Sequence, residues 1–389
     1  MRRKSRILTV FLGILFFLNP SVIAQNKGVS IKGNLRVLYL EGNSYERGLK
    51  HGKALKKEIH ELVRLWKANL EKSRKTDADV FIKKFVERTD FHKAIEKWTP
   101  ELWNELKGIS DGSGIDFDTI YAFQLVDEEW VFGREIQSEH CTTLGVKKTS
   151  DNPAFVAQNL DIPAFYHSFQ TLIHIKDSQR DMETFLFTFP GFIAANGIND
   201  RSVGVVVNAV TQLENSCDGL PVAFVIRGIL QRKTYAEAVK FIRSIKHGAP
   251  QNYMIGGPDK VGSFECSISN VSEFVPFEGA KFTYHTNHPL KNKKYTPQFF
   301  QFLKKRNLSP GEYKFPCPRF KALQEKFKDN SAQLDLDVLK SIFSDRETII
   351  NNGGTFGCTI MVLGKVPELH ISPGRPDSEP FQVYRFNKK

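Results

Sequence analysis

The 389-residue chain is poor in cysteine and contains no C-x-x-C pair, no internal repeat and no low-complexity segment. The missing cysteine pairs exclude the common structural zinc sites. The five cysteines are Cys141, Cys217, Cys266, Cys317 and Cys358. An odd number in an oxidising compartment predicts that one thiol stays free. We expect that thiol to be Cys141, and the spacing assigns no disulfide pairing to the others.

The sequence also lacks a dense basic run interleaved with aromatic residues, although its formal net charge is +12. Lys and Arg are scattered over stretches with helical periodicity, which is typical of a solvated surface. We therefore expect no nucleic-acid partner. Such a surface would suit anionic membranes or acyl substrates.

The apolar stretch at the N-terminus, residues 7–18, is too short to span a bilayer, which takes about 20 residues. It follows a basic start that includes Arg2 and Arg3, and it precedes the small-residue site Val22-Ile23-Ala24. This order is typical of a secretory signal peptide. The sequence therefore predicts a signal peptide over residues 1–24, export to the periplasm or the extracellular space, and membrane contact only through that signal. The alternative is an uncleaved anchor.

Helical patterns dominate the residues that precede Cys141. A strand is predicted at 32–41, and Ser44 is the predicted N-cap of an amphipathic helix over 45–75. Gly48 and Gly52 lie four residues apart in this helix and predict close packing against another element. Further helices are predicted around residues 77–88, 93–97, 100–110 and 116–125.

Strand patterns dominate from Cys141 onward. Strands are predicted at 141–146, 154–160, 184–189, 191–195, 203–207, 253–255, 262–267, 274–277, 281–286, 359–362, 368–371 and 381–385. Helices are predicted at 221–246, 319–328 and 336–343. This order indicates an α+β protein with two sheets faced by helices, not a doubly wound parallel sheet.

The first two of these strands form a predicted hairpin around the polar turn 147–152. A hairpin brings the end of its second strand back beside the start of its first. We therefore expect the Asp161 carboxylate and the Cys141 thiol to be neighbours. A buried structural cysteine at a strand start is the alternative interpretation of Cys141.

Two segments, Glu139-His140-Cys141-Thr142-Thr143 and Gln158-Asn159-Leu160-Asp161, resemble the penicillin-acyltransferase and choloylglycine-hydrolase branch of the N-terminal nucleophile (Ntn) hydrolases. The resemblance implies that the chain cuts itself between His140 and Cys141. The freed Cys141 would then carry both the nucleophilic sulfur and its base, an α-amine with a pKa near 8. His140 stands where the acyltransferases commonly have Gly, and Gln158 stands where choloylglycine hydrolases usually have Arg.

The resemblance also implies roles for four residues beside Cys141. Asn208 and Asn287 end strands and would hold the oxyanion, and Asp161 would hold the cysteine amine or a neighbouring donor. Arg319 would favour the thiolate and bind the aspartate, although Pro316 replaces the usual Ser of that motif. Asn or Asp at a strand end is otherwise ordinary turn chemistry, and Arg319 is otherwise a surface arginine near a helix start.

The resemblance implies an αββα Ntn-hydrolase sandwich over residues 141–389, preceded by a helical precursor segment over 25–140. The expected function is cleavage or transfer of the acyl group of a linear amide through a Cys141 thioester, without a cofactor or metal. The expected partners are a small acyl-amide substrate and the retained N-terminal fragment. The alternatives are a phospholipase-B-like lipid amidase or esterase and a catalytically inactive binding protein.

Three other motifs compete with this interpretation. Gly108-Ile109-Ser110-Asp111-Gly112 matches the serine-hydrolase elbow G-x-S-x-G, but a predicted helix precedes Ser110 where the elbow needs a strand. His285 and His288 lack the Glu and the helix of a zinc-protease motif. The glycines at 353–357 are followed by no Gly-Lys-Ser/Thr and predict a turn into a strand.

Overall fold

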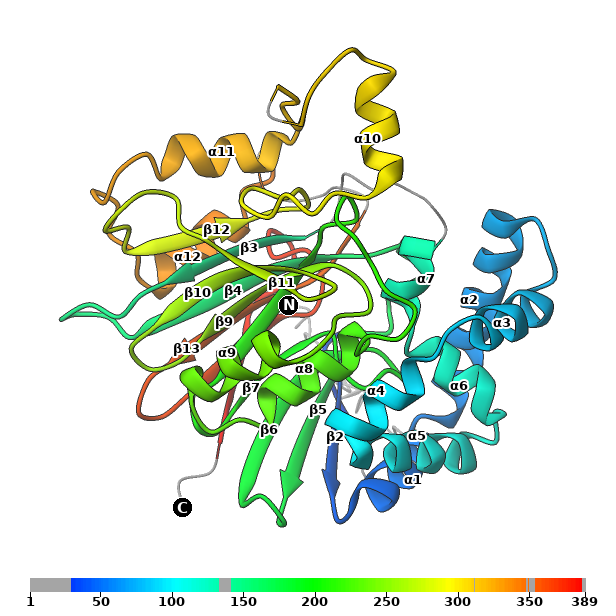
Figure 1. Ribbon diagram of the computed structural model, residues 1–389. Coiled ribbons are helices and arrows are strands. Elements are labelled where there is room, and N and C mark those ends of the chain that lie inside the picture. The colour runs from blue at the N-terminus through cyan, green and yellow to red at the C-terminus, as the bar shows by residue number, and fades with distance from the viewer. Residues whose placement is uncertain (1–28, 133–140, 311, 348, 350–353, 387–389) are drawn as a thin grey trace, which may run out of the picture.

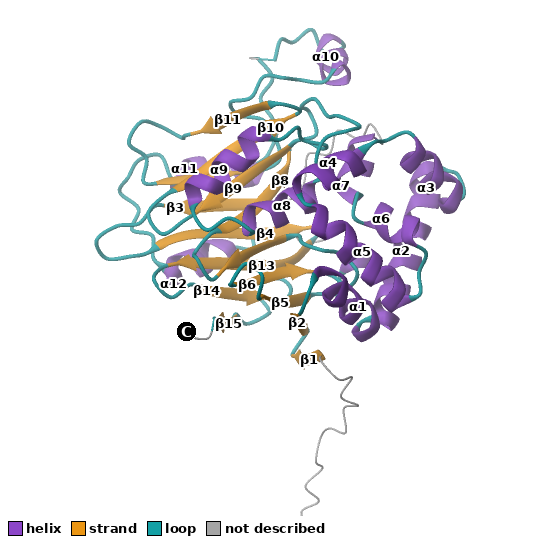
Figure 2. Cartoon of the chain, turned by 60° about the horizontal axis from the view of Figure 1, so that its bottom comes forward, coloured by secondary structure: helices purple, strands orange, loops and turns teal. Residues whose placement is uncertain are grey.

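The computed structural model describes residues 29–132, 141–310, 312–347, 349 and 354–386. Two β-sheets pack face to face, and helices cover their outer faces, so the layers follow the order αββα (Figures 1 and 2). Seven further helices, α1 to α7, lie beside the sheets. The predicted α+β class with two helix-covered sheets is confirmed. The predicted signal peptide, residues 1–24, and His140 lie outside the described residues.

One sheet has nine strands and the other has six. The nine-stranded sheet runs in the order β1 (Val29–Lys32), β2 (Leu35–Glu41), β5 (Thr171–Asp177), β6 (Met182–Thr188), β7 (Asn196–Asn199), β8 (Gly204–Ala209), β9 (Gln251–Gly256), β10 (Val261–Ser267), β11 (Asn270–Phe274). The six-stranded sheet runs β12 (Phe282–His285), β3 (Thr142–Val146), β4 (Ala154–Asp161), β13 (Thr355–Leu363), β14 (Glu368–Ser372), β15 (Gln382–Arg385). The paired strands are antiparallel except for β2 and β5, which are parallel.

Helices on both outer faces explain the composition of the central strands. The nine-stranded sheet is covered by α8 (Val222–Leu230) and α9 (Tyr235–Ser244), and the six-stranded sheet by α11 (Pro318–Lys326) and α12 (Leu336–Phe343). Every residue of β3, β4, β9 and β10 is buried, because a second layer covers each face of these strands. Leu323 and Phe343 of these helices share an apolar core with Leu144 and Ile360 of the six-stranded sheet.

The N-terminal helices are α1 (Ser44–Ala54), α2 (Lys56–Arg74), α3 (Ala78–Glu87), α4 (Phe91–Trp98), α5 (Pro100–Ser113), α6 (Phe117–Phe123) and α7 (Val126–Phe132). Helices α1 and α5 cross at their glycines. A Cβ atom on Gly48 would lie 1.9 Å from the carbonyl oxygen of Glu105, and one on Gly108 would lie 2.2 Å from that of Tyr45. The predicted close packing of Gly48 and Gly52 is therefore confirmed. No helix in the described part of the chain is long and apolar enough to cross a membrane.

Several predicted boundaries are wrong. The helix predicted over 45–75 divides at Leu55 into α1 and α2, and Asn43, not Ser44, caps α1 through a capping box with Glu46. The helix predicted over 221–246 divides into α8 and α9, with Thr234 capping the second. β5, α7 and α10 (Pro297–Lys304) were not predicted.

Residues 191–195 form no strand, although they were predicted as one. Side chains satisfy their backbone donors instead: Gly191 N–H donates to His51 Nε2 at 3.0 Å, and Ile193 N–H donates to Gln124 Oε1 at 3.0 Å. The strand lies one segment later, because 196–199, predicted as a turn, is β7 and pairs with β6 and β8.

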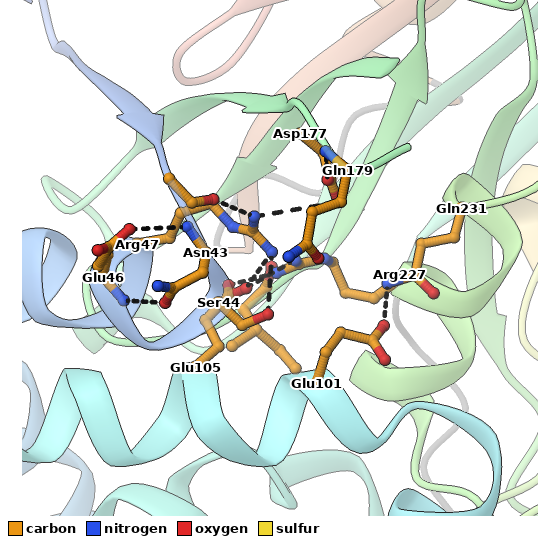
Figure 3. Close-up of polar contacts among 12 residues, drawn as sticks. Asn43, Ser44, Glu46, Arg47, Glu101, Glu105, Asp177, Gln179, Arg227 and Gln231 are labelled. Carbon is orange, nitrogen blue, oxygen red and sulfur yellow. Dashed lines mark hydrogen bonds and ion pairs between the residues drawn. The ribbon is translucent and has the colours of Figure 1, made fainter. Parts of the chain in front are cut away.

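A buried cluster of charges joins the N-terminal helices to the sheet layer (Figure 3). Glu105 of α5 accepts two hydrogen bonds from Arg227 of α8, at 2.6 and 2.9 Å, and lies 3.6 Å from Arg47 of α1. Arg47 is also 3.9 Å from Asp177 of β5. Burial opposes ionisation of Glu105, but the charges of Arg227 and Arg47 outweigh it and hold its pKa below the ordinary value. We call Arg47, Glu105, Asp177 and Arg227 the buried ion cluster.

Candidate active site

The β3–β4 hairpin brings Cys141 and Asp161 together, as predicted. Thr142 pairs with Asn159, so Cys141, just before β3, lies at the level where β4 ends. The Cys141 thiol lies 3.9 Å from the carbonyl oxygen of Asp161. Both residues are buried between the sheets and the N-terminal helices.

Two side chains from other elements hold the main-chain carbonyl of Cys141. Asn208 of β8 donates its Nδ2–H to this oxygen at 3.2 Å, and Arg319 of α11 donates from Nη1 at 2.6 Å. Arg319 also donates to the hydroxyl of Thr142 at 2.8 Å. The backbone at Cys141 is therefore fixed by groups that are 67 and 178 residues away in the sequence.

Asn287 completes the group that the sequence predicted. It lies two residues beyond His285, which pairs with Thr143, and so lies close to the level of Cys141. Its Oδ1 accepts from Arg319 Nη2 at 3.3 Å, and its Nδ2 donates to the carbonyl of Ala209 at 3.2 Å. The structure thus brings all five predicted site residues together.

One predicted contact within this group is wrong. Arg319 forms no ion pair with Asp161, because its guanidinium is directed at the carbonyl of Cys141, at Thr142 and at Asn287. Burial raises the pKa of Asp161 and of the Cys141 thiol, and the positive charge of Arg319 offsets only part of this rise.

A chain of polar side chains fixes the orientation of the Asn208 amide. Its Oδ1 accepts from Thr143 Oγ1 at 2.7 Å and from Asn252 Nδ2 at 3.1 Å. Asn252 in turn accepts from Ser263 Oγ at 2.8 Å. Because the oxygen of Asn208 is engaged by two donors, its nitrogen must face Cys141. The sequence did not predict Thr143, Asn252 or Ser263, since each reads as an ordinary polar residue within a strand.

Asp161 has one satisfied and one unsatisfied carboxylate oxygen. Oδ1 accepts from Thr355 Oγ1 at 2.7 Å, whereas Oδ2 is buried and has no hydrogen-bond partner among the described residues. Burial raises the pKa of Asp161 to about 6, against the opposing effects of Arg319 and Thr355. The carboxyl is therefore mostly ionised at neutral pH and has room for one further donor.

The Cys141 thiol is protonated in the uncut chain. Burial and the charge of Asp161 raise its pKa to about 12, and Arg319 only partly offsets them. The backbone is also strained here, since Cys141 has a φ of +34°. A non-glycine residue held in this region costs about 1–3 kcal/mol.

The Cys141 thiol faces a small apolar cavity of about 50 Å³. Leu160, Phe192 and Val207 contribute to its walls, together with Asp127 and Trp130 of α7. We call it the thiol cavity. Its low volume in the uncut chain leaves space for only a few water molecules.

The half-buried Asp127 and the buried Glu128 are acids that the sequence did not predict as part of the site. Asp127 accepts from Gln251 Nε2 at 2.9 Å, and burial raises its pKa to about 6. Glu128 Oε1 accepts from the backbone N–H groups of Val222 and Ala249, at 2.9 and 3.3 Å. Burial and the charge of Asp127 raise the Glu128 pKa to about 8. The sequence did not predict this burial, because a run of acidic residues at the start of a helix is usually exposed to solvent.

Glu128 makes the stability of the uncut chain dependent on pH. Its pKa in the folded chain is about 8, above the ordinary value of 4.5. Between pH 4.5 and pH 8, Glu128 therefore keeps its proton in the folded chain and loses it in the unfolded chain. Stability therefore falls as pH rises from 4.5 to 8. We expect Glu128→Gln to raise the free energy of unfolding by roughly 2–4 kcal/mol more at pH 9 than at pH 5.

Urea denaturation followed by tryptophan fluorescence measures this difference, with Cys141→Ala in every variant so that the chain stays intact. The exposed carboxylate of Glu96 gives the control, and Glu96→Gln should change stability equally little at both pH values. A gain from Glu128→Gln that is the same at pH 5 and pH 9 would contradict the assignment.

The motifs at Ser110 and His285 do not form the sites that they resemble. Ser110 lies inside α5, where its hydroxyl donates to the carbonyl of Ile115 at 2.7 Å, so the strand–turn–helix of a serine-hydrolase elbow is absent there. His285 is bonded to Glu265 at 2.8 Å. No group of three or more His, Cys, Asp or Glu that could hold a metal ion occurs in the described part of the chain. His140, the residue before the predicted cleavage point, lies outside the described residues.

Comparison with known proteins places the chain in a family. Protein dcd1B of Dictyostelium discoideum is 25% identical over 218 residues, which are 50% of this chain and 42% of that protein. The chain thus matches less than half the length of this curated relative. Two crystal structures of conjugated bile acid hydrolase from Clostridium perfringens, a mutant and a variant, are each 15% identical and cover 64% of this chain and 98% of theirs, with TM-scores of 0.35 and 0.34.

The family model described as acyl-coenzyme A:6-aminopenicillanic acid acyl-transferase matches residues 148–352, which is more than half of the chain. This range contains Asp161, Asn208, Asn287 and Arg319, the four predicted partners of Cys141. The chain therefore belongs to the acyl-coenzyme A:6-aminopenicillanic acid acyl-transferase family.

Proposed function

We propose that this protein is an exported, self-processing cysteine hydrolase that removes or transfers the acyl group of a linear amide. Membership of the acyl-transferase family supports an enzyme that hydrolyses amides or transfers acyl groups. Cleavage between His140 and Cys141 would make Cys141 the first residue of the mature catalytic chain. Hydrolysis is the favoured outcome outside the cell, where acyl-CoA donors are scarce.

The arrangement at Cys141 is the observation that carries the proposal. Asn208 and Arg319 hold its carbonyl, while Asp161 keeps one buried carboxylate oxygen without a described partner. A new α-ammonium group on Cys141 would supply the donor that this oxygen lacks. A purely structural cysteine would need neither the two donors on its carbonyl nor an unpaired carboxylate oxygen beside it.

The catalytic cycle follows from this arrangement. The neutral α-amine accepts the thiol proton while the sulfur attacks the substrate carbonyl, and Asn208 and Asn287 donate to the resulting oxyanion. The tetrahedral intermediate then collapses, the C–N bond breaks, and the α-ammonium returns its proton to the leaving amine. Water, or an acceptor amine, attacks the thioester on Cys141 and releases the acyl group.

The uncut chain is a latent form in this scheme. Its thiol is protonated because its pKa is about 12, and α7 lines the thiol cavity. Cutting the chain would place an amine with a pKa near 8 beside the sulfur. The strained φ of Cys141, directly after the scissile bond, favours a reaction that releases the strain, in which the thiol attacks the carbonyl of His140.

The N-terminal fragment would stay bound after the cut. β2 belongs to this fragment and pairs with β5 inside the nine-stranded sheet, and the buried ion cluster joins α1 and α5 to α8. Loss of the fragment would expose the β5 edge and leave Arg227 buried without Glu105. The mature protein is therefore a complex of two chains.

Intact mass and N-terminal sequencing of the secreted, purified protein test the proposal. The expected result is two co-purifying chains, one that begins near Gln25 and one that begins at Cys141. A single chain that begins near Gln25 and shows no amidase activity would favour the inactive binding protein instead. Activity toward lipid esters, with none toward N-acyl amides, would favour the phospholipase-B-like alternative.

A further inference from the structure

A second and larger cavity, of about 300 Å³, lies next to the candidate site. Its walls come from α10 and from the segment 313–317 that leads into α11, and Gln212 and Asn287 contribute to its base. We call it the aromatic cavity, since Phe299, Phe302, Tyr313, Phe315 and His288 line it. The proposed mechanism leaves this cavity without a role.

The rings form an ordered stack rather than a loose cluster. Phe315 lies nearly parallel to His288, with 4.8 Å between ring centroids, and nearly parallel to Phe299, at 5.7 Å. Tyr313 meets Phe315 edge to face at 4.8 Å. Flat apolar groups fit such a lining, because aromatic rings favour stacked or edge-to-face neighbours.

Among the described residues that line the aromatic cavity, only Arg306 is charged at neutral pH. Burial lowers the pKa of His288 to about 3, so this residue is neutral. The Arg306 guanidinium lies 3.8 Å over the centre of the Phe302 ring and is exposed to solvent. It forms no ion pair with any described residue, so its donors can bind an anionic group at the rim.

Gln212 supplies an unused acceptor at the base of the cavity. Its side chain is fully buried, and its Nε2 donates to the carbonyl of Asn287 at 3.3 Å. Its Oε1 has no partner among the described residues. A buried acceptor without a donor costs about 1–3 kcal/mol, so a ligand with an N–H group would relieve this cost.

The aromatic cavity and the thiol cavity lie on two sides of the residues that hold Cys141. Asn287 lines the aromatic cavity and accepts from Arg319, which donates to the carbonyl of Cys141. A substrate whose scissile carbonyl lies at Cys141 has two halves that must point in different directions. The amine half, unlike an acyl chain, carries the N–H donor that Gln212 lacks.

We propose that the aromatic cavity binds the leaving-amine half of the substrate, and that this amine is an aromatic amino acid with a free carboxylate. The ring lies among Phe299, Phe302 and Phe315, the carboxylate binds Arg306, and the nitrogen faces Gln212. This inference rests on the proposed amidase function. It narrows the substrate class to N-acyl aromatic amino acids.

Four amides with one common acyl group test the inference on the purified, processed enzyme. Their amine halves are L-phenylalanine, L-phenylalaninamide, L-alanine and ethanolamine, and the acyl group is whichever gives the fastest turnover in a preliminary panel. We expect kcat/KM for the phenylalanine conjugate to exceed that for the alanine conjugate at least about tenfold, because the ring becomes buried. Equal values would overturn the inference while leaving the amidase proposal intact.

Arg306→Gln isolates the contribution of the charge. We expect it to lower kcat/KM for the phenylalanine conjugate about fivefold, mainly through KM, and to leave the phenylalaninamide conjugate nearly unchanged. The control is Lys305→Gln, which removes the same charge from an exposed neighbour that does not line the cavity. Equal losses on both conjugates, or from both variants, would contradict the role of Arg306.

A binding measurement separates failure of the cavity from failure of the enzyme. Titration calorimetry of L-phenylalanine into the uncut Cys141→Ala variant needs no turnover. Heat of binding that Arg306→Gln weakens and Lys305→Gln does not would support the cavity even if no amidase activity were found. Absence of binding, together with amidase activity that ignores the amine half, would exclude the cavity as the leaving-group site.

Discussion

Cys141→Ala is expected to leave the chain uncut and to lower turnover of N-acyl amides at least about 10⁴-fold, the scale of loss when a covalent nucleophile is removed. In the proposed mechanism the sulfur is both the group that attacks the peptide bond before Cys141 and the nucleophile of the mature enzyme. The α-amine that acts as its base would form only with that cut. Mass spectrometry of the purified protein measures the first effect, and an amine-release assay measures the second.

Cys141→Ser separates processing from turnover, because a hydroxyl can still attack a strained peptide bond but is a weaker nucleophile at neutral pH. Cys217→Ser is the matched control, since Cys217 is an exposed free thiol and should leave both readouts unchanged. Unaltered amidase activity in Cys141→Ala would place the nucleophile elsewhere. The family assignment would survive that result, because it does not depend on Cys141.

Glu105→Gln is expected to lower the free energy of unfolding by about 3–5 kcal/mol, because Arg227 would remain buried without its counter-ion and Arg47 would keep only Asp177, 3.9 Å away. The side chains of all three residues are almost fully inaccessible, so water cannot replace the lost charge. Urea denaturation of the uncut chain, in the Cys141→Ala background, measures the loss. In the processed protein, size-exclusion chromatography should show weaker retention of the N-terminal fragment.

Glu41→Gln provides the control for this substitution. Glu41 forms an ion pair with Lys176 at 3.7 Å, but both side chains are about half exposed, and such pairs contribute at most about 1 kcal/mol. If Glu105→Gln costs no more than Glu41→Gln, the buried ion cluster does not hold the helices to the sheet layer. The double variant of Arg227 and Glu105, both changed to Met, should recover part of the loss, because neither charge of that hydrogen-bonded pair then remains buried.

The elements that a short stretch of sequence defines by itself were predicted correctly. α12 and the β3–β4 hairpin were predicted closely, since an amphipathic period and a polar turn define them without help from the rest of the chain. The division of the 45–75 helix at Leu55 was missed because no Gly or Pro marks it. Residues 191–195 have strand-like composition, but His51 and Gln124 bind their backbone, and these partners are far away in sequence.

The candidate site was predictable in part for the same reason. The hairpin alone predicted that Cys141 and Asp161 are neighbours, whereas Asn208, Asn287 and Arg319 were found through family resemblance. Thr355 and Asn252 were not found, because their hydrogen bonds span 194 and 44 residues and neither residue belongs to a recognisable motif. The aromatic cavity depends on α10, which was itself not predicted.

The position of β2 between β1 and β5 affects whether the proposed mature protein can refold after denaturation. The strand enters the sheet while it is still covalently joined to the rest of the chain. After the proposed cleavage the same pairing would become a bimolecular step, so recovery after denaturation would depend on protein concentration. The processed enzyme would then owe its persistence to slow unfolding rather than to reversible refolding, and its thermal inactivation should depend on heating rate.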